Sequence, residues 1–442
     1  MEARAWIPVG PPVAHPLPSY WHDPKSPLAN VIEPEPDKAT VPYDYAVIGS
    51  GISGTLVTFN LLQQDSSARI VMLEAREACG GATGRNGGHT KAASYRTYLQ
   101  HRRDLGVEEA LKIARLEYAN IKETHKLAQE LDIRCENQLC STVDIIYDDE
   151  TFDQGKVAIE QLKADATEEE RQNDEMACYS IYEKGESILQ QFYVSVKNGN
   201  LEVQKIEQPT GAFQYLAGRI NAYRFSTSIL KVCVRKGLQL CTNTPVHSIL
   251  QSAEYSTEAP IYDVFTQYNT IQARTVILAT NGYTAHLISS LQGVIVPLRG
   301  QITVQRPGAA TKLPDPLPTT YSFIYRDGYE YMIPRPLPEG GQHMIIGGGL
   351  GRQPEDGAGE FGTVDDSSLN PAISKYLRNS LVGYFGAENW GESPEESHSR
   401  VVQEWTGIMG ATADGRPFVG EMPSQKGIWI SAGFNGHGRF WG

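Results

Sequence analysis

Apolar and polar residues follow a regular order from Tyr43 onward. Residues 45–48 and 69–73 are short apolar runs, and residues 52–64 between them have apolar positions at a helical period. A strand, a helix and a second strand in this order form a βαβ unit, which is nearly always right-handed and places both strands in one parallel sheet. The pattern therefore predicts an α/β fold that begins near residue 43.

The rest of the chain continues with helical and strand-like segments. Residues 299–350 are dense in β-favouring residues and turns, so we expect an antiparallel sheet that forms a second domain. The other expected elements are helices over 107–131, 150–190 and 225–236 and strands over 238–240, 246–249 and 275–280.

Residues 1–42 are rich in proline, which cannot continue a helix or a central strand. We therefore expect an extended N-terminal arm in place of a domain. Trp6, Tyr20 and Trp21 indicate that this arm packs onto the body of the protein.

Composition narrows the class of protein. The 442 residues are 40% hydrophobic and 21% charged, which is typical of a globular chain with two or three domains. The formal net charge of −13 repels a phosphate backbone, so nucleic acid is not an expected partner. The six cysteines contain no CxxC pair, which favours reduced thiols, and no metal site is predicted. Without a signal peptide or a membrane-length apolar run, we expect a cytoplasmic protein that has no membrane partner.

The turn Gly49-Ser50-Gly51-Ile52-Ser53-Gly54 lies between the first strand and the first helix. In a dinucleotide-binding fold, one glycine makes the turn, the next lets the backbone approach a pyrophosphate, and the third packs helix on strand. A plain glycine turn in another α/β fold is the alternative, because this motif alone is weak. Glu74 stands 20 residues after Gly54 at the end of the second strand, where a carboxylate can accept hydrogen bonds from a ribose.

A second glycine-rich stretch, residues 79–89, follows the second strand and includes Gly84-Arg85-Asn86-Gly87-Gly88-His89. An ordinary nicotinamide dehydrogenase does not require this second backbone-exposing loop. FAD does, because its ribityl chain and flavin ring extend beyond the pyrophosphate. The side chains of Arg85 and Asn86 could each be structural.

These motifs resemble the D-amino-acid-oxidase-like (DAO) family of FAD-dependent oxidoreductases, which includes sarcosine, glycine and γ-glutamylputrescine oxidases. The arm and the second glycine loop together are similar to fungal members. Further matches to the family are Ala279-Thr280-Asn281-Gly282, Pro297-Leu298-Arg299-Gly300-Gln301, Trp405-Thr406-Gly407-Ile408-Met409-Gly410, Thr412-Ala413-Asp414-Gly415-Arg416-Pro417 and Gly433-Phe434-Asn435-Gly436-His437-Gly438.

The resemblance implies a Rossmann-like FAD-binding domain of the glutathione-reductase type together with an antiparallel-sheet α+β substrate domain. The FAD-binding domain would comprise residues 43–100, 206–298 and 396–442, and the substrate domain residues 101–205 and 299–395. The residues implied to bind the cofactor are Gly49, Gly51, Ile52, Ser53, Gly54, Glu74, Ala75, Arg76, Thr83, Gly84, Arg85, Asn86, Gly87, Gly88, His89, Val246, Ala279, Thr280, Asn281, Gly282, Trp405, Gly407, Gly436, His437 and Gly438.

The chemistry implied by the family is hydride transfer from a carbon next to an amine nitrogen to flavin N5. The imine is then hydrolysed, and dioxygen reoxidises the flavin with release of hydrogen peroxide. The expected partners are therefore a small amine or amino-acid-like substrate and dioxygen. The flavin supplies the difficult chemistry while the protein orients the reactants.

The implied catalytic residues are His89, Lys91, Arg299 and Tyr331. His89 would tune the flavin or attach it covalently, or would be a packed histidine that makes hydrogen bonds. Lys91 would activate dioxygen, or would be a surface lysine. Arg299 would bind a carboxylate or the flavin through its guanidinium, or would form a structural ion pair.

The aromatic residues Tyr331 and Trp405 would form part of a cage for an amine, or would belong to the core. Arg299, Gln301, Tyr329 and Tyr331 are implied to cover the reactive face of the flavin together.

The C-terminal sequence departs from the family pattern. Members usually continue past Gly436-His437-Gly438 with Met and a helix aimed at the flavin, whereas this sequence has Arg439-Phe440-Trp441-Gly442. A missing helix would remove about 0.3–1 kcal/mol of favourable interaction from an exposed charge. This departure motivates one alternative, a flavin-poor or inactive member with a binding or regulatory role. A flavin dehydrogenase or desaturase that uses another electron acceptor is a further alternative.

Overall fold

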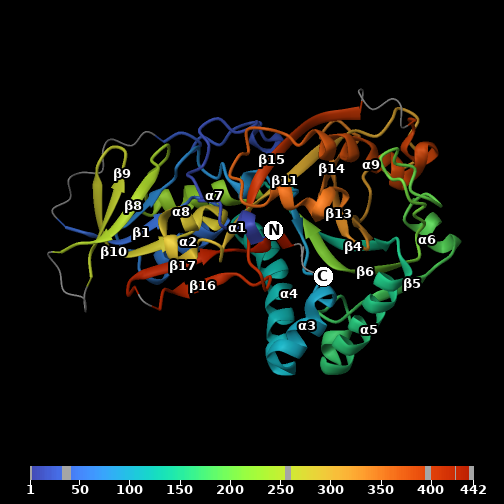
Figure 1. Cartoon of the computed structure of the whole chain (residues 1–442), viewed down its shortest axis with the longest axis horizontal. Helices are drawn as coiled ribbons and strands as arrows, with labels where there is room; N and C mark the ends of the chain where they lie inside the picture. Colours follow the sequence, from blue (N-terminus) through green and yellow to red (C-terminus); the bar gives the residue numbers. More distant parts are fainter. Residues whose placement is uncertain (1, 32–40, 254–259, 394–399, 424, 438–442) are drawn as a thin grey trace.

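The computed structural model describes residues 2–31, 41–253, 260–393, 400–423 and 425–437. Two sheets form the framework and lie toward opposite ends of the long axis (Figure 1). No helix among these residues has the length and apolar character required to cross a membrane.

The first sheet contains the predicted βαβ unit, which is confirmed. Its path is β16-β17-β10-β1-β2-β7, and β8 and β9 extend it beside β10. All neighbouring pairs from β17 to β7 are parallel. Helices α2 and α7 pack together beside this sheet. The elements are β1 (Tyr43–Ile48), α2 (Ile52–Gln64), β2 (Ile70–Leu73), α7 (Ala222–Arg235), β7 (Gln239–Cys241), β8 (Val246–Gln251), β9 (Tyr262–Thr266), β10 (Thr270–Leu278), β16 (Phe418–Glu421) and β17 (Ile428–Ala432).

The second sheet has the order β15-β11-β14-β13-β12-β4-β6-β3, and β5 pairs with β6. The antiparallel pairs from β11 to β12 confirm the sheet that was predicted over residues 299–350. The strands are β3 (His89–Thr90), β4 (Gln138–Ile146), β5 (Ser180–Glu183), β6 (Gly211–Arg219), β11 (Val296–Gln305), β12 (Thr320–Tyr325), β13 (Gly328–Pro336), β14 (Gln342–Gly347) and β15 (Val401–Ala411).

Helices cover both faces of the second sheet. Helix α9 lies in the core cluster of one face, and α3 and α5 pack on the other face near β4 and β6. The remaining helices are α1 (Glu2–Ala5), α3 (Tyr95–Leu105), α4 (Val107–Glu130), α5 (Asp149–Asp165), α6 (Glu186–Gln191), α8 (Thr284–Leu287) and α9 (Pro371–Trp390). The helix predicted over 150–190 is correct only for its first part, because residues 180–183 pair with β6 as an edge strand.

The strands do not follow the predicted domain segments closely. Strands β6 and β15 lie in the second sheet, although residues 206–298 and 396–442 were assigned to the FAD-binding domain. Strand β15 pairs with β11 over nearly its full length, so backbone hydrogen bonds tie it to that sheet. The division into domains stays a prediction.

Residues 2–31 of the predicted N-terminal arm cross the body and contact both sheets, and Val9 belongs to the core cluster of the first sheet. Arg76 Nη1 donates to the carbonyl of Val13 at 3.3 Å, and the hydroxyl of Tyr20 pairs with His343 of β14 at 2.6 Å. The described residues of the arm include two short helical segments, α1 and a turn at Tyr20–His22.

Candidate functional site

The three glycines of the first turn have different surroundings. Gly49 has a φ of 106°, and a Cβ on it would lie 2.5 Å from the carbonyl oxygen of Ala279. A Cβ on Gly54 would overlap the carbonyl oxygen of Gly49. A Cβ on Gly51 would meet only the hydroxyl of Thr83, at 3.1 Å. Gly49 and Gly54 therefore allow close packing of the backbone, while Gly51 leaves an open surface.

The N-terminus of α2 begins at this open surface. The N–H of Ile52 donates to Thr83 Oγ1 at 2.9 Å. Within the described ranges, nothing accepts a hydrogen bond from the N–H groups of Ser53 and Gly54. Free N–H groups and the positive end of a helix bind anions, so this cradle fits the pyrophosphate of a dinucleotide.

Glu74 supports the glycine turn from inside the protein. Its Oε2 accepts hydrogen bonds from the N–H and hydroxyl of Ser50 at 3.0 and 2.7 Å. Its Oε1 accepts one from the N–H of Arg76 at 3.0 Å. A carboxylate has about four acceptor positions, so these bonds leave capacity for a ribose. The contact between Glu74 and a ribose stays a prediction.

Arg76 and Arg85 have structural partners. Arg76 forms an ion pair with the fully buried Asp366 at 2.9 Å. Arg85 donates to the carbonyls of Gly80, Thr406 and Leu17 at 2.8 to 2.9 Å. Burial lowers the pKa of Arg85 to about 10, partly offset by Asp366. The guanidinium of Arg85 therefore fixes the loop, which leaves its backbone as the part that could contact a cofactor.

The second glycine loop runs from β2 of the first sheet to β3 of the second. We call residues 79–89 the cofactor loop. Its Gly87 packs so closely on the ring of Tyr331 in β13 that a Cβ would overlap the ring. His89 Nε2 lies 2.8 Å from the hydroxyl of Thr320 in β12. The loop therefore lies against one face of the second sheet.

Just beyond the loop, Lys91 belongs to a buried polar cluster. Its ammonium pairs with Asp144 of β4 and donates to the hydroxyl of Ser322 at 2.6 Å. The fully buried Asp144 also accepts from the hydroxyls of Tyr95 and Tyr215, both at 2.8 Å. Burial lowers the pKa of Lys91, and the nearby Asp144 opposes this shift. Lys91 is therefore not a surface lysine.

Asp144 was missed as a site residue in the sequence. The available signal was a single carboxylate inside the otherwise apolar run Val143-Asp144-Ile145-Ile146. Such a group needs donors when it is buried. Those donors, Tyr95, Tyr215 and Lys91, come from other segments of the chain.

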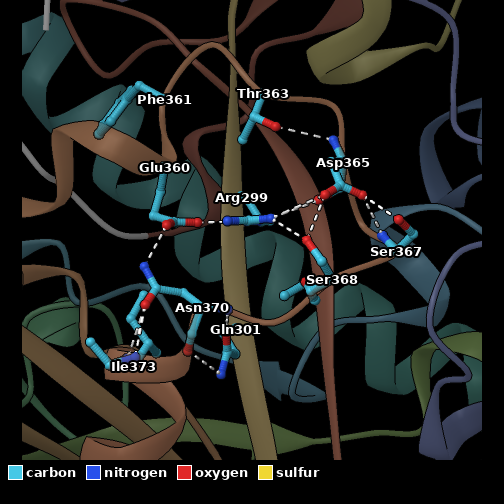
Figure 2. A network of polar contacts seen from close by, with 12 residues as sticks. Arg299, Gln301, Glu360, Phe361, Thr363, Asp365, Ser367, Ser368, Asn370 and Ile373 are labelled. Atoms are coloured by element: carbon cyan, nitrogen blue, oxygen red, sulfur yellow. Dashed lines mark hydrogen bonds and ion pairs between the residues drawn. The ribbon is translucent and has the colours of Figure 1, made fainter.

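Arg299 forms a structural network (Figure 2). Its Nε donates to Glu360 at 2.6 Å, and its Nη1 donates to the hydroxyl of Ser368 at 3.0 Å and to the carbonyl of Asp365 at 3.2 Å. The structure contains the ion pair that was one interpretation of Arg299, and the binding of a carboxylate or of the flavin by this residue stays a prediction.

The sheet also separates residues that were expected to act together. Gln301 donates to Ser374 of α9 at 2.7 Å, and Arg299 shares its face because alternate residues of a strand point the same way. Tyr331 of β13 pairs with Gly347 of β14, which pairs with Ile302 of β11, so the three residues share a face. Ile302 is the neighbour of Gln301 in the strand and points the other way, so Tyr331 lies on the face opposite Gln301. Arg299 and Gln301 therefore do not share a surface with Tyr329 and Tyr331.

Trp405 is a core residue. It is fully buried, its indole N–H donates to the carbonyl of Arg85 at 2.8 Å, and its ring stacks on Tyr20. It thus supports the cofactor loop from behind and does not line an amine cage.

The family motifs that follow residue 278 in the sequence contact one another beside the first sheet. Asn281 Oδ1 accepts from the N–H groups of Gly433 and Phe434 at 3.0 and 3.3 Å. A Cβ on Gly282 would overlap the carbonyl of Met409, and one on Gly407 would lie 3.0 Å from Arg85 Cβ.

The remaining predicted positions are less informative. Val246 is buried at the start of β8 and pairs with Thr266 of β9. The contact predicted for Gly438 and the departure at residues 439–442 lie outside the described residues.

Comparisons with known proteins agree with this arrangement. The model of the family "FAD dependent oxidoreductase" (DAO) matches residues 44–439. Glycine oxidase from Geobacillus kaustophilus (strain HTA426) is 21% identical over 397 residues, which cover 88% of this chain and 87% of that protein.

Two solved structures show the shared fold. The crystal structure of glycine oxidase from Geobacillus kaustophilus has a TM-score of 0.63 at 20% identity and covers 90% of this chain and 91% of its own. An L-amino acid deaminase from Proteus vulgaris has a TM-score of 0.60 at 14% identity and covers 94% and 91%. These likenesses confirm the fold class expected from the sequence. Since the family match also spans nearly the whole chain and includes both glycine motifs, the protein belongs to the DAO family of FAD-dependent oxidoreductases.

Proposed function

We propose that the protein oxidises the C–N bond of an amino acid or a related amine, with dioxygen as the final electron acceptor. The observation that carries the proposal is a group of polar and aromatic side chains on the face of the second sheet that the cofactor loop contacts. Tyr331 lies against Gly87 of the loop, Lys91 bonds to Ser322, the strand partner of Tyr331, and Arg96 lies over Tyr329. The names of the similar proteins, glycine oxidase and L-amino acid deaminase, support an amino-acid substrate. Bound FAD would supply the hydride acceptor, and the protein would orient the substrate.

Arg96 favours an amino acid over a simple amine. Its guanidinium lies 4.5 Å above the ring of Tyr329, and the side chain is half-buried near the start of α3. It makes no ion pair or hydrogen bond to any residue that the structure describes. A partly desolvated guanidinium without an anionic partner binds a carboxylate through charge-assisted hydrogen bonds. Arg96 would therefore hold the carboxylate of the substrate.

Anaerobic bleaching of the flavin tests the substrate class. We expect bleaching by amino acids in a panel that also contains amines without a carboxylate. Arg96→Met should raise the KM for the amino acid by about tenfold or more, because the charge-assisted hydrogen bonds are lost. Arg103→Met is the matched control, since Arg103 is exposed on the same helix. Equal bleaching by amines, or an unchanged KM in Arg96→Met, would contradict the assignment.

Lys91 is the proposed site of dioxygen activation. Lys91→Met should slow reoxidation by dioxygen and leave reoxidation by an artificial acceptor unchanged. Because the substitution also leaves Asp144 without its cation, flavin content is measured in the same sample. Equal reoxidation by dioxygen in variant and parent removes Lys91 from this role. Slow reoxidation of the parent by dioxygen would favour the dehydrogenase alternative, and a colourless protein that never accepts FAD would favour the flavin-poor one.

A further inference from the structure

The arm lies outside the matched family region, residues 44–439, yet it contacts the loop that the cofactor needs. The hydroxyl of Ser19 donates to the carbonyl of Gly84 at 2.6 Å. The indole N–H of Trp21 donates to the carbonyl of Asn86 at 2.5 Å. Both arm side chains are buried, with 4% and 3% of their surface exposed. Two carbonyls of the cofactor loop are therefore bonded to the arm.

The arm is itself fixed at several points around these two residues. The N–H of Leu17 donates to the carbonyl of Asp366 at 2.8 Å, and Gln403 donates to the carbonyl of Pro18 at 2.8 Å. Further along, the N–H of Ser26 donates to the hydroxyl of Tyr223 at 3.0 Å. Ser19 and Trp21 are thus held in place by contacts on both sides.

These bonds orient the peptide groups of the loop. In a trans peptide, the C=O of one residue and the N–H of the next point in opposite directions. The carbonyl of Asn86 points to Trp21, so the N–H of Gly87 points away from the arm. Within the described part of the chain, no group accepts a hydrogen bond from this N–H. It is directed to the side of the loop opposite the arm, where a cofactor would lie.

Other contacts hold the loop at Arg85, whose guanidinium donates to the carbonyl of Thr406 and whose own carbonyl accepts from Trp405. The peptide group between Asn86 and Gly87 depends on the arm, because among the described residues Trp21 alone donates to the carbonyl of Asn86. A glycine-rich segment loses much conformational entropy when it is ordered, so external contacts are needed to fix it.

We infer that Ser19 and Trp21 are positioning residues for FAD, and that docking of the arm and binding of FAD stabilise each other. The arm holds the loop with the Gly87 N–H available, and FAD binds the loop in that form. Because coupling between two binding events is reciprocal, FAD must also favour the docked arm. The inference rests on FAD as the cofactor and does not depend on the substrate or on dioxygen.

Binding of FAD to the apoprotein provides the first test. Ser19→Ala and Trp21→Phe should raise the Kd for FAD by about three- to tenfold, since each removes one hydrogen bond to the loop. Ser19→Thr keeps the hydroxyl and should restore the parental Kd. Ser26→Ala is the matched control, because Ser26 lies in the arm and its hydroxyl accepts from Leu28 without touching the loop. The visible spectrum of bound flavin should shift in Trp21→Phe and stay unchanged in the control.

Limited proteolysis of the full chain provides the second test. Lys25 is an exposed lysine of the arm, and Lys184 is an exposed lysine between β5 and α6. If docking of the arm strengthens FAD binding by a given factor, saturating FAD should slow trypsin cleavage after Lys25 by about the same factor. Cleavage after Lys184 should not change. The inference is overturned if Ser19→Ala and Trp21→Phe lower the melting temperature of the apoprotein while leaving the Kd for FAD and the flavin spectrum unchanged. It is equally overturned if FAD fails to protect Lys25.

Discussion

A methyl group added at Gly51 would have different neighbours from one added at Gly54. Substitutions at these two glycines therefore distinguish an effect on FAD binding from an effect on folding. In Gly51→Ala the added Cβ would lie 3.1 Å from Thr83 Oγ1 and near no other atom of the described residues. The free energy of unfolding of this apoprotein should therefore lie within about 1 kcal/mol of the parental value. The same methyl would occupy the surface that fits a phosphate. We expect the Kd for FAD to rise by about tenfold or more, measured by quenching of flavin fluorescence.

Gly54→Ala is the contrasting variant, because its Cβ would overlap the carbonyl oxygen of Gly49. The first strand and α2 cannot then pack at their present distance. We expect loss of soluble folded protein, measured by circular dichroism and thermal unfolding. A folded Gly54→Ala protein, or normal FAD binding in Gly51→Ala, would contradict the roles given to these glycines.

His22 makes the stability of the protein depend on pH. Burial, together with the nearby Arg85, lowers the pKa of His22 to about 4, and its Nε2 accepts no hydrogen bond from the described residues. Above about pH 6.5 the imidazole is neutral in both folded and unfolded chains, so the full stability is present. As the pH falls from about 6.5 to 4, only the unfolded chain takes up the proton, and the free energy of unfolding falls by up to about 3 kcal/mol.

Urea denaturation at several pH values measures this effect. In His22→Phe, which keeps a ring beside Tyr223, this part of the pH dependence should disappear. His15, an exposed histidine elsewhere in the arm, provides the control for replacing a histidine by phenylalanine. Parallel curves for parent and His22→Phe would show that another group is responsible.

Residue roles were the part of the site that the sequence could predict least. The turn at Gly49 was predictable because its strand, glycines and helix are adjacent in the chain. The role of Arg299 depends on Glu360, 61 residues away, and that of Arg85 on Thr406, 321 residues away. A guanidinium suits a substrate carboxylate and a structural partner equally well, so residue type alone does not distinguish the two.

At the scale of elements, helix α9 starts from a polar cap that reaches Arg299 (Figure 2). Asn370 Oδ1 accepts from the N–H groups of Ala372 and Ile373 at 3.0 and 3.3 Å. Its Nδ2 donates to Glu360 at 2.7 Å, and Glu360 accepts from Arg299. One side chain thus caps the helix and completes the ion-pair network.

Asn370→Ala should lower the free energy of unfolding by about 1–2 kcal/mol, because it removes the cap and one donor to Glu360. Asn370→Ser keeps a capping hydroxyl and should recover part of the loss. Urea denaturation measures both. Ser367→Ala is a control in the same segment, because among the described residues Ser367 bonds to Asp365 alone. A loss in Asn370→Ala no larger than that in the control would show that α9 does not depend on this cap.

Helix α9 also shows why some elements were not predicted. Its buried residues lie on most sides of the helix and include the consecutive run Asn379–Phe385. A helix buried nearly all round has no polar face, so its apolar positions do not repeat at a helical period. The two strands and the helix of the βαβ unit have distinct apolar runs separated by turn residues, and they were predicted correctly.

At the scale of the whole molecule, the chain passes between the two sheets several times, including through α7 from β6 to β7 and through α8 from β10 to β11. The cofactor loop passes from β2 to β3, the arm contacts both sheets, and β15 leads back to β16 and β17. A ligand held by the α2 N-terminus and by the cofactor loop would contact elements of both sheets. FAD should therefore stabilise the molecule as one unit.

Hydrogen–deuterium exchange tests this expectation. At an FAD concentration of 100 times Kd, binding adds about 2.7 kcal/mol to the free energy of unfolding. Amides that exchange through global unfolding should then slow in β1 and β10 of the first sheet and equally in β12 and β13 of the second. The exposed segment at residues 184–185, between β5 and α6, exchanges by local opening and should not respond. Protection confined to the first sheet would mean that the second sheet unfolds independently, in which case the cofactor loop and the arm would not couple the two sheets.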